Sequence, residues 1–133
     1  MIRPIIFILM TAVLTACTSA PTVEHQVTGQ TRPAVSPADV LFIQHAPEHY
    51  QEIGIVSAQS PKSSTSLDES VTDALIELLK AEAAALGANA VVMTYLGDQS
   101  ETVRVNSFDG FQGGARDELR VQRLVQGLAI YVE

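Results

Sequence analysis

The residue best suited to a chemical role is Cys17, the single cysteine of the chain. It ends the tetrapeptide LTAC (positions 14–17), after an apolar run over residues 5–14 that Arg3 precedes. A short positive start and about ten apolar residues are typical of a secretory signal peptide, whereas a membrane-spanning helix needs roughly 20. LTAC at the end of such a peptide is typical of a bacterial lipobox, whose cysteine sulfur takes a diacylglyceryl group. We therefore expect residues 1–16 to be a lipoprotein signal peptide and Cys17 to become the lipidated N-terminus.

The alternative is ordinary signal cleavage with Cys17 as a bystander. The best competing cut, after Ala20, would place Pro21 behind the scissile bond, where its fixed φ and missing N–H are unfavourable. Several acyl chains on Cys17 would give durable anchoring. Thr18 stands where an aspartate marks inner-membrane retention in enterobacteria, so we expect an outer-membrane anchor facing the periplasm rather than an inner-membrane one.

His45, Glu48 and His49 match H-x-x-E-H, the inverted zinc-protease motif. That chemistry requires both imidazoles on one face of a helix, with the glutamate beside them as a general base. Pro47 lies inside the motif, lacks an N–H and opposes a regular helix there. A polar turn between two strands is the favoured interpretation, and a small-ligand or metal-binding envelope module using these three residues is the alternative.

Other chemical patterns are weak. The serines form no G-x-S-x-G elbow, and the glycines of 110–114 do not lead from a strand into a helix as a phosphate loop does. The net charge of −7, with only 8 basic residues, argues against a nucleic-acid partner. The basic cluster of Arg116, Arg120 and Arg123 is expected to be solvated. We expect no catalytic residue, metal or cofactor, and a non-enzymatic protein.

Residues 17–38 are expected to form a flexible linker, because this stretch is rich in Pro, Thr and Ser and shows no apolar periodicity. The remaining residues, 39–133, are expected to form one small domain. Its length and its apolar content suffice for a single core.

The clearest element is a helix that Ser66 caps, with Glu69 completing a capping box and Gly87 ending it. Its apolar residues recur every three or four positions, which indicates one buried stripe: Val71, Ala74, Leu75, Leu78, Leu79, Ala85 and Leu86.

Strands are expected at 40–43, 53–56, 91–96, 103–105 and 119–132, with a bulge near Gln126-Gly127. Beyond that bulge, Leu128, Ile130 and Val132 should face one side and Ala129 and Tyr131 the other. Mobile loops are expected at 59–66 and 106–116. The sequence thus predicts an α+β fold, with one long helix on a mostly antiparallel sheet of about five strands.

Three segments carry a resemblance to a known family. They are RPAVSP (32–37) followed by Val40 and PEHYQEIG (47–54), the helix-to-strand join LKAEAAALGANAVV (79–92), and GLAIYV (127–132). Together they resemble the YbjQ/RcsF-like superfamily of small α+β domains, often found as bacterial lipoproteins of unknown function. The resemblance implies contact with a protein partner or self-association, because RcsF-type members report envelope stress by binding proteins and YbjQ-type members assemble as rings. The structural disulfides of RcsF-type members have no counterpart in this chain.

Overall fold

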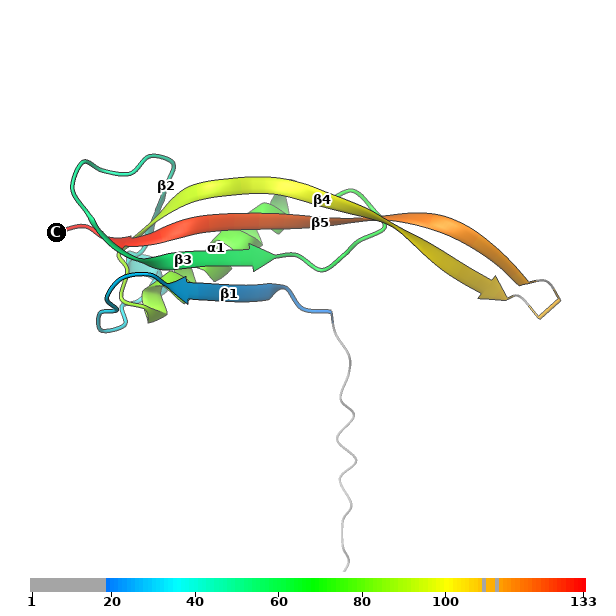
Figure 1. Ribbon diagram of the computed structural model, residues 1–133, viewed down its shortest axis with the longest axis horizontal. Coiled ribbons are helices and arrows are strands. Elements are labelled where there is room, and N and C mark those ends of the chain that lie inside the picture. The colour runs from blue at the N-terminus through cyan, green and yellow to red at the C-terminus, as the bar shows by residue number, and fades with distance from the viewer. Residues whose placement is uncertain (1–18, 109, 112) are drawn as a thin grey trace, which may run out of the picture.

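One α-helix covers one face of a five-stranded sheet in the computed structural model, which describes residues 19–108, 110–111 and 113–133 (Figure 1). The strand order across the sheet is β1-β3-β5-β4-β2. The elements are β1 (Thr22–Val27), a 3-10 turn η1 (Pro37–Asp39), β2 (Leu41–Ile43), β3 (Gln51–Gln59), α1 (Glu69–Ala85), β4 (Ala90–Phe108) and β5 (Gly113–Tyr131).

The expected α+β fold with one helix on about five strands is confirmed. The sheet is mixed, because β2 runs parallel to β4 while the other neighbours pair antiparallel. The helix, expected to be long, has 17 residues. No helix within the described part of the chain is long and apolar enough to span a bilayer.

The expectation of a flexible linker over 17–38 is wrong for most of that stretch. Thr22–Val27 pairs along β3, and Val23 packs against the core. An edge strand gains its hydrogen bonds from its neighbour and needs little apolar alternation, so the polar composition concealed it. Further along, the N–H of Arg32 donates to Leu86 O and that of Val35 to Ala84 O, each at 3.0 Å. The folded unit therefore begins at β1 rather than at residue 39.

Helix α1 begins two residues later than the sequence predicts. Asp68, not Ser66, is the N-cap, and its carboxylate accepts from the Ser70 N–H at 3.0 Å. An ionised cap at the positive end of the helix dipole is favourable, which accounts for the choice. The buried stripe is formed by Leu75, Leu79, Ala83, Ala84 and Leu86, while Val71 and Leu78 are half-buried and Ala74 and Ala85 are exposed.

The predicted end of the helix at Gly87 is confirmed. Gly87 has a φ of 88°, and its N–H donates to Ala84 O while that of Ala88 donates to Ala83 O. This pair of bonds is the Schellman arrangement, which a left-handed glycine permits.

The core lies between α1 and the sheet. Leu79, Val56, Val125 and Ala129 are fully buried there, and Tyr131 packs against them. On the other face of the sheet a smaller cluster gathers Ala90, Val92 and Ile130 with Ile43, Leu128 and Val132. The predicted division of the last strand into two faces is confirmed. The bulge is in β4 instead, between Met93 and Tyr95, directly opposite Gly127 and Gln126.

The two outer ends of β4 and β5 form a long hairpin. The sequence predicts separate strands at 91–96 and 103–105 and a loop over 106–116, but β4 and β5 are continuous and stay paired as far as Phe108 and Gly113. Figure 1 shows this hairpin projecting well beyond the helix. Residues 100–108 and 113–121 are called the arm below. Along β4 in the arm only Val103 and Val105 alternate with polar residues, so the sequence indicates a short strand there and not the whole arm.

Candidate functional site

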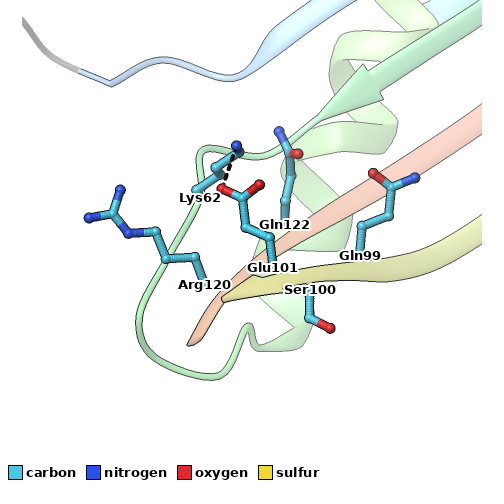
Figure 2. A pocket seen from close by; sticks show the side chains of 6 residues that line it. All are labelled: Lys62, Gln99, Ser100, Glu101, Arg120 and Gln122. Carbon is cyan, nitrogen blue, oxygen red and sulfur yellow. Dashed lines mark hydrogen bonds and ion pairs between the residues drawn. The ribbon is translucent and has the colours of Figure 1, made fainter. Parts of the chain in front are cut away.

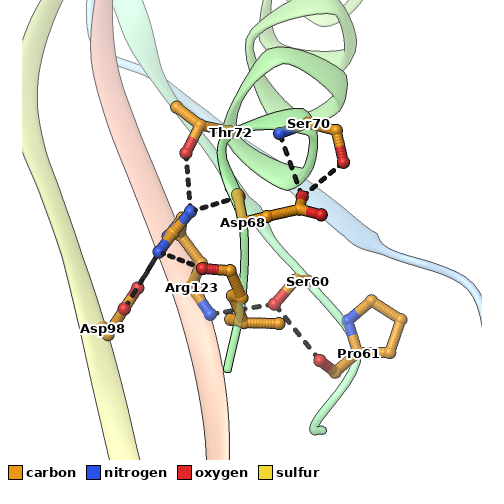
Figure 3. A network of polar contacts seen from close by, with 8 residues as sticks. Ser60, Pro61, Asp68, Ser70, Thr72, Asp98 and Arg123 are labelled. Carbon is orange, nitrogen blue, oxygen red and sulfur yellow. Dashed lines mark hydrogen bonds and ion pairs between the residues drawn. The ribbon is translucent and has the colours of Figure 1, made fainter. Parts of the chain in front are cut away.

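Arg123 joins three elements at the root of the arm (Figure 3). Its Nε and Nη2 donate to the two carboxylate oxygens of Asp98 on β4, at 2.7 and 3.1 Å. Its Nη1 donates to Asp68 O at 2.7 Å and to Thr72 Oγ1 at 2.9 Å, and Nη2 also reaches Leu67 O at 3.3 Å. The planar guanidinium therefore fixes β4, β5 and the start of α1 to one another. The expectation that Arg123 is a solvated charge is wrong, since its side chain is only 15% exposed.

The loop after β3 is also held at this root. Ser60 is buried, its hydroxyl accepts from the Arg123 N–H at 2.8 Å, and its own N–H donates to Arg123 O. Ser63 and Val121 exchange two backbone hydrogen bonds of 2.8 and 2.7 Å. The predicted mobile loop over 59–66 is therefore pinned against β5.

The other two arginines of the basic cluster agree with their expected solvated role. Arg116 and Arg120 each lie 3.9 Å from Glu118, and their side chains are 73% and 40% exposed. Ion pairs of this length and exposure contribute little to stability. Neither arginine forms a closed anion site.

The charges at the arm root perturb one another in a definite direction. The hydrogen bonds from Arg123 hold the pKa of Asp98 below its ordinary value, against the opposing effect of desolvation. The same interaction raises the pKa of Arg123. The pKa of Asp68 is lowered chiefly by the hydrogen bond from the Ser70 hydroxyl.

An Asp98→Asn protein is expected to show a weaker loss of stability in acid than the native chain. A carboxyl whose pKa is lower in the folded state stabilises the fold above its ordinary titration range, about pH 4, and loses that contribution as the pH falls. Urea unfolding at several pH values between 7 and 3 measures the slope. Asp39→Asn, an exposed carboxylate on η1, is the control and should leave the slope near that of the native chain. Equal slopes for the native and Asp98→Asn proteins would contradict the role given to this pair.

A shallow hollow lies beside the arm root, lined by Lys62, Gln99, Ser100, Glu101, Arg120 and Gln122 (Figure 2). Lys62 Nζ donates to Glu101 Oε1 at 2.6 Å, and both side chains are about half exposed. The lining offers one carboxylate between two cations and no imidazole or thiol. This arrangement provides neither a nucleophile with its base nor a metal ligand set.

The outer edge of β4 is the most distinctive surface. The β2 strand covers it only from Ala90 to Val92, and no other described strand lies beside it from Met93 to Phe108. Such an edge presents unpaired N–H and C=O groups and readily accepts a further strand. Lys and Pro, which often protect edges, are both absent from the β4 sequence.

The H-x-x-E-H residues lie between β2 and β3, outside any helix. His45, Glu48 and His49 are all exposed, and the backbone there is bent. Among the described residues no group of three or more His, Cys, Asp or Glu side chains is placed to hold a metal ion. The polar-turn interpretation agrees with this geometry. Cys17 lies outside the described residues.

Three contacts of the N-terminal segment were not predicted from the sequence. His25 on β1 bonds through Nδ1 to Glu82 of α1. The Arg32 guanidinium lies 3.5 Å from the centre of the Tyr131 ring and donates to Gln51 Oε1 at 2.9 Å. No local sequence signal marks these pairs, because each depends on how distant segments fold together.

The arm was also missed, although a signal for it exists. Opposite charges stand at equal distances on either side of its tip, with Glu101 opposite Arg120 and Arg104 opposite Asp117. Cross-strand pairs of opposite charge stabilise a hairpin, so this mirror pattern could have predicted the register.

No family model matches the sequence, and no curated protein matches it. One solved structure with a similar chain is that of a Francisella virulence factor, FvfA, crystallised in an orthorhombic form. The match has a TM-score of 0.50 at 14% sequence identity and covers 82% of this chain and 97% of that one. At this identity the match shows a similar fold alone.

Proposed function

We propose that this chain is a lipid-anchored envelope protein that acts through protein–protein contacts and has no enzymatic activity. Its acylated Cys17 holds it on the outer membrane, facing the periplasm. The observation that carries the contact role is the uncovered outer edge of β4 along the arm. The lipobox at positions 14–17 supports the anchor.

The arm edge suits a partner that adds a strand. In such complexes main-chain hydrogen bonds supply affinity, and alternate side chains of the added strand supply specificity. The Arg123 contacts fix the base of β4 and β5, so the edge is presented on a rigid support. A partner protein or a second copy of the chain can supply the strand.

The resemblance to the YbjQ/RcsF-like superfamily extends this proposal. It supports a role in sensing envelope stress or in envelope assembly. In either role the arm would bind the partner protein. A protein of this type needs no catalytic constellation, and the polar hollow beside the arm root offers none.

The proposal is tested by crosslinking in intact cells followed by fractionation. A photo-reactive amino acid replaces Thr102, which is exposed on the arm, and the same replacement at Ala81, exposed on α1, is the matched control. We expect higher-mass adducts in the outer-membrane fraction for position 102 and far fewer for position 81. In a Cys17→Ala background the protein should take up no labelled palmitate and should leave that fraction.

The controls separate the anchor from the contact. Thr18→Asp should keep the lipid but move the protein to the inner membrane in an enterobacterial host. Identical fractionation of Cys17→Ala and the native chain, with an unmodified precursor recovered, would overturn the anchor. Equal crosslinking from positions 81 and 102 would overturn the assignment of the contact to the arm. An adduct of twice the chain mass would identify a second copy as the partner.

A further inference from the structure

The arm and the N-terminal end of the domain point in the same direction. Thr22 at the start of β1 pairs with Gln59, and Gln59 pairs in turn with Leu124. Leu124 lies opposite Gly97, and from that level β4 continues outward to Phe108. Because β1 is antiparallel to β3, its first residue lies at the end of the sheet from which the arm projects, and residues 19–21 leave the sheet there (Figure 1).

The arm is longer than the chain that connects Cys17 to the sheet. From Ser100 to Phe108 the arm advances about 26 Å, at a rise of roughly 3.3 Å per residue, and the strand from Gly97, at the level of Thr22, adds about 10 Å. From Cys17 to Thr22 the backbone can span at most about 18 Å. When the lipid on Cys17 is in a bilayer, the distance from the start of β1 to that bilayer is therefore shorter than the arm.

The tip carries the chemistry of a membrane contact. Phe108 is 77% exposed and Phe111 is 97% exposed, the two largest exposures among the large apolar side chains of the described residues. An apolar ring gains free energy when it moves from water into the acyl boundary of a bilayer. The charges of the arm's two strands balance, with Arg104, Arg116 and Arg120 against three carboxylates, Glu101, Asp117 and Glu118. Asp109, which follows Phe108 in the sequence, adds one negative charge.

The acidic part of the molecule lies elsewhere. Asp73, Glu77 and Glu82 are on α1, which covers only the sheet region behind the arm. When the arm contacts an anionic leaflet, the surface nearest the lipid is therefore close to neutral. The acidic helix α1 lies away from the tip, so its repulsion by the leaflet is small.

We propose that the arm tip, through Phe108 and Phe111, docks on the same lipid leaflet that holds the acyl chains of Cys17. This inference rests on the proposed lipid anchor. The tip contact adds a second attachment to the lipid anchor, so the domain is oriented on the membrane and the free edge of β4 is presented beside it. An acyl anchor and a second weak contact together bind far more tightly than either alone.

The chain contains no tryptophan, which provides a clean test. Phe111→Trp and Phe108→Trp each place a single fluorophore at the tip. Tyr50→Trp is the matched control, because Tyr50 is exposed just before β3, at the opposite end of the sheet. Each full-length lipidated protein is incorporated into phosphatidylethanolamine–phosphatidylglycerol vesicles, with or without bromine on the acyl chains, and flotation of the protein with the vesicles is measured first.

We expect all three proteins to float, and emission from Phe111→Trp and Phe108→Trp to move to shorter wavelength and fall at least about twofold with brominated lipid. Emission from Tyr50→Trp should not respond. Floating protein whose tip fluorophores are unquenched would overturn the tip contact and leave the anchor standing. Failure to float would overturn the anchor and the inference that rests on it. A short-wavelength shift that grows with protein density and is insensitive to bromine would place the tip against a second copy and overturn the lipid assignment.

Discussion

A Gly87→Ala protein is expected to be about 3 kcal/mol less stable than the native chain. Gly87 has a φ of 88°, in the left-handed region that costs an alanine about 1–2 kcal/mol. A Cβ there would also lie 2.4 Å from the Arg32 carbonyl oxygen. The segment around Arg32 must then move, which weakens its hydrogen bond to Leu86 O and its contact with the Tyr131 ring.

The matched control is Gly110→Ala at the arm tip. Gly110 has a similar φ of 93°, but a Cβ there meets no atom within 4 Å. Its substitution should cost about 1 kcal/mol, the backbone contribution alone. Urea unfolding followed by circular dichroism measures both. Equal losses for the two variants would show that the approach of Arg32 to Gly87 has no energetic consequence.

The same packing explains why the N-terminal segment escaped prediction. Residues 22–35 carry few apolar side chains, and their order comes from backbone hydrogen bonds to β3 and to the last turn of α1. Those partners lie far away in the sequence. The composition of a segment indicates whether it can bury its own apolar surface. It does not indicate whether a distant strand edge or carbonyl group is available as a hydrogen-bond partner.

The centre of the domain was predictable for the opposite reason. The apolar stripe of α1, the glycine at its end and the apolar strand that follows are all local patterns, and each has a direct physical cause. The two faces of the last strand were also predicted, because alternation from Leu128 to Val132 is set by strand geometry alone. The exact N-cap was not predicted, since Ser66 and Asp68 are both good caps. Asp68 has two advantages: its charge is stabilised at the positive end of the helix dipole, and Arg123 binds its carbonyl oxygen.

Some features of the candidate site could likewise be predicted from local sequence, whereas others depend on the fold. The proposed lipid anchor at Cys17 rests on the motif at positions 14–17 alone, because that cysteine lies outside the described residues and the fold does not test it. The role of Arg123 required the fold, because its partners come from β4, α1 and the loop before α1. The arm edge required it too, since an edge exists only where a sheet ends.

A Leu79→Ala protein is expected to lose about 3 kcal/mol of stability, whereas Leu119→Ala should change it by no more than about 0.5 kcal/mol. Leu79 is fully buried between α1 and the sheet, so the truncation leaves a cavity. Leu119 lies on the arm and is 56% exposed, and the same truncation there opens no cavity. Urea unfolding of both variants measures the difference. A loss of comparable size at Leu119 would mean that the arm belongs to the cooperative core. A negligible loss would mean that Leu119 adds no packing to the core, as expected of an exposed side chain on an arm that extends beyond α1 and is available for contacts.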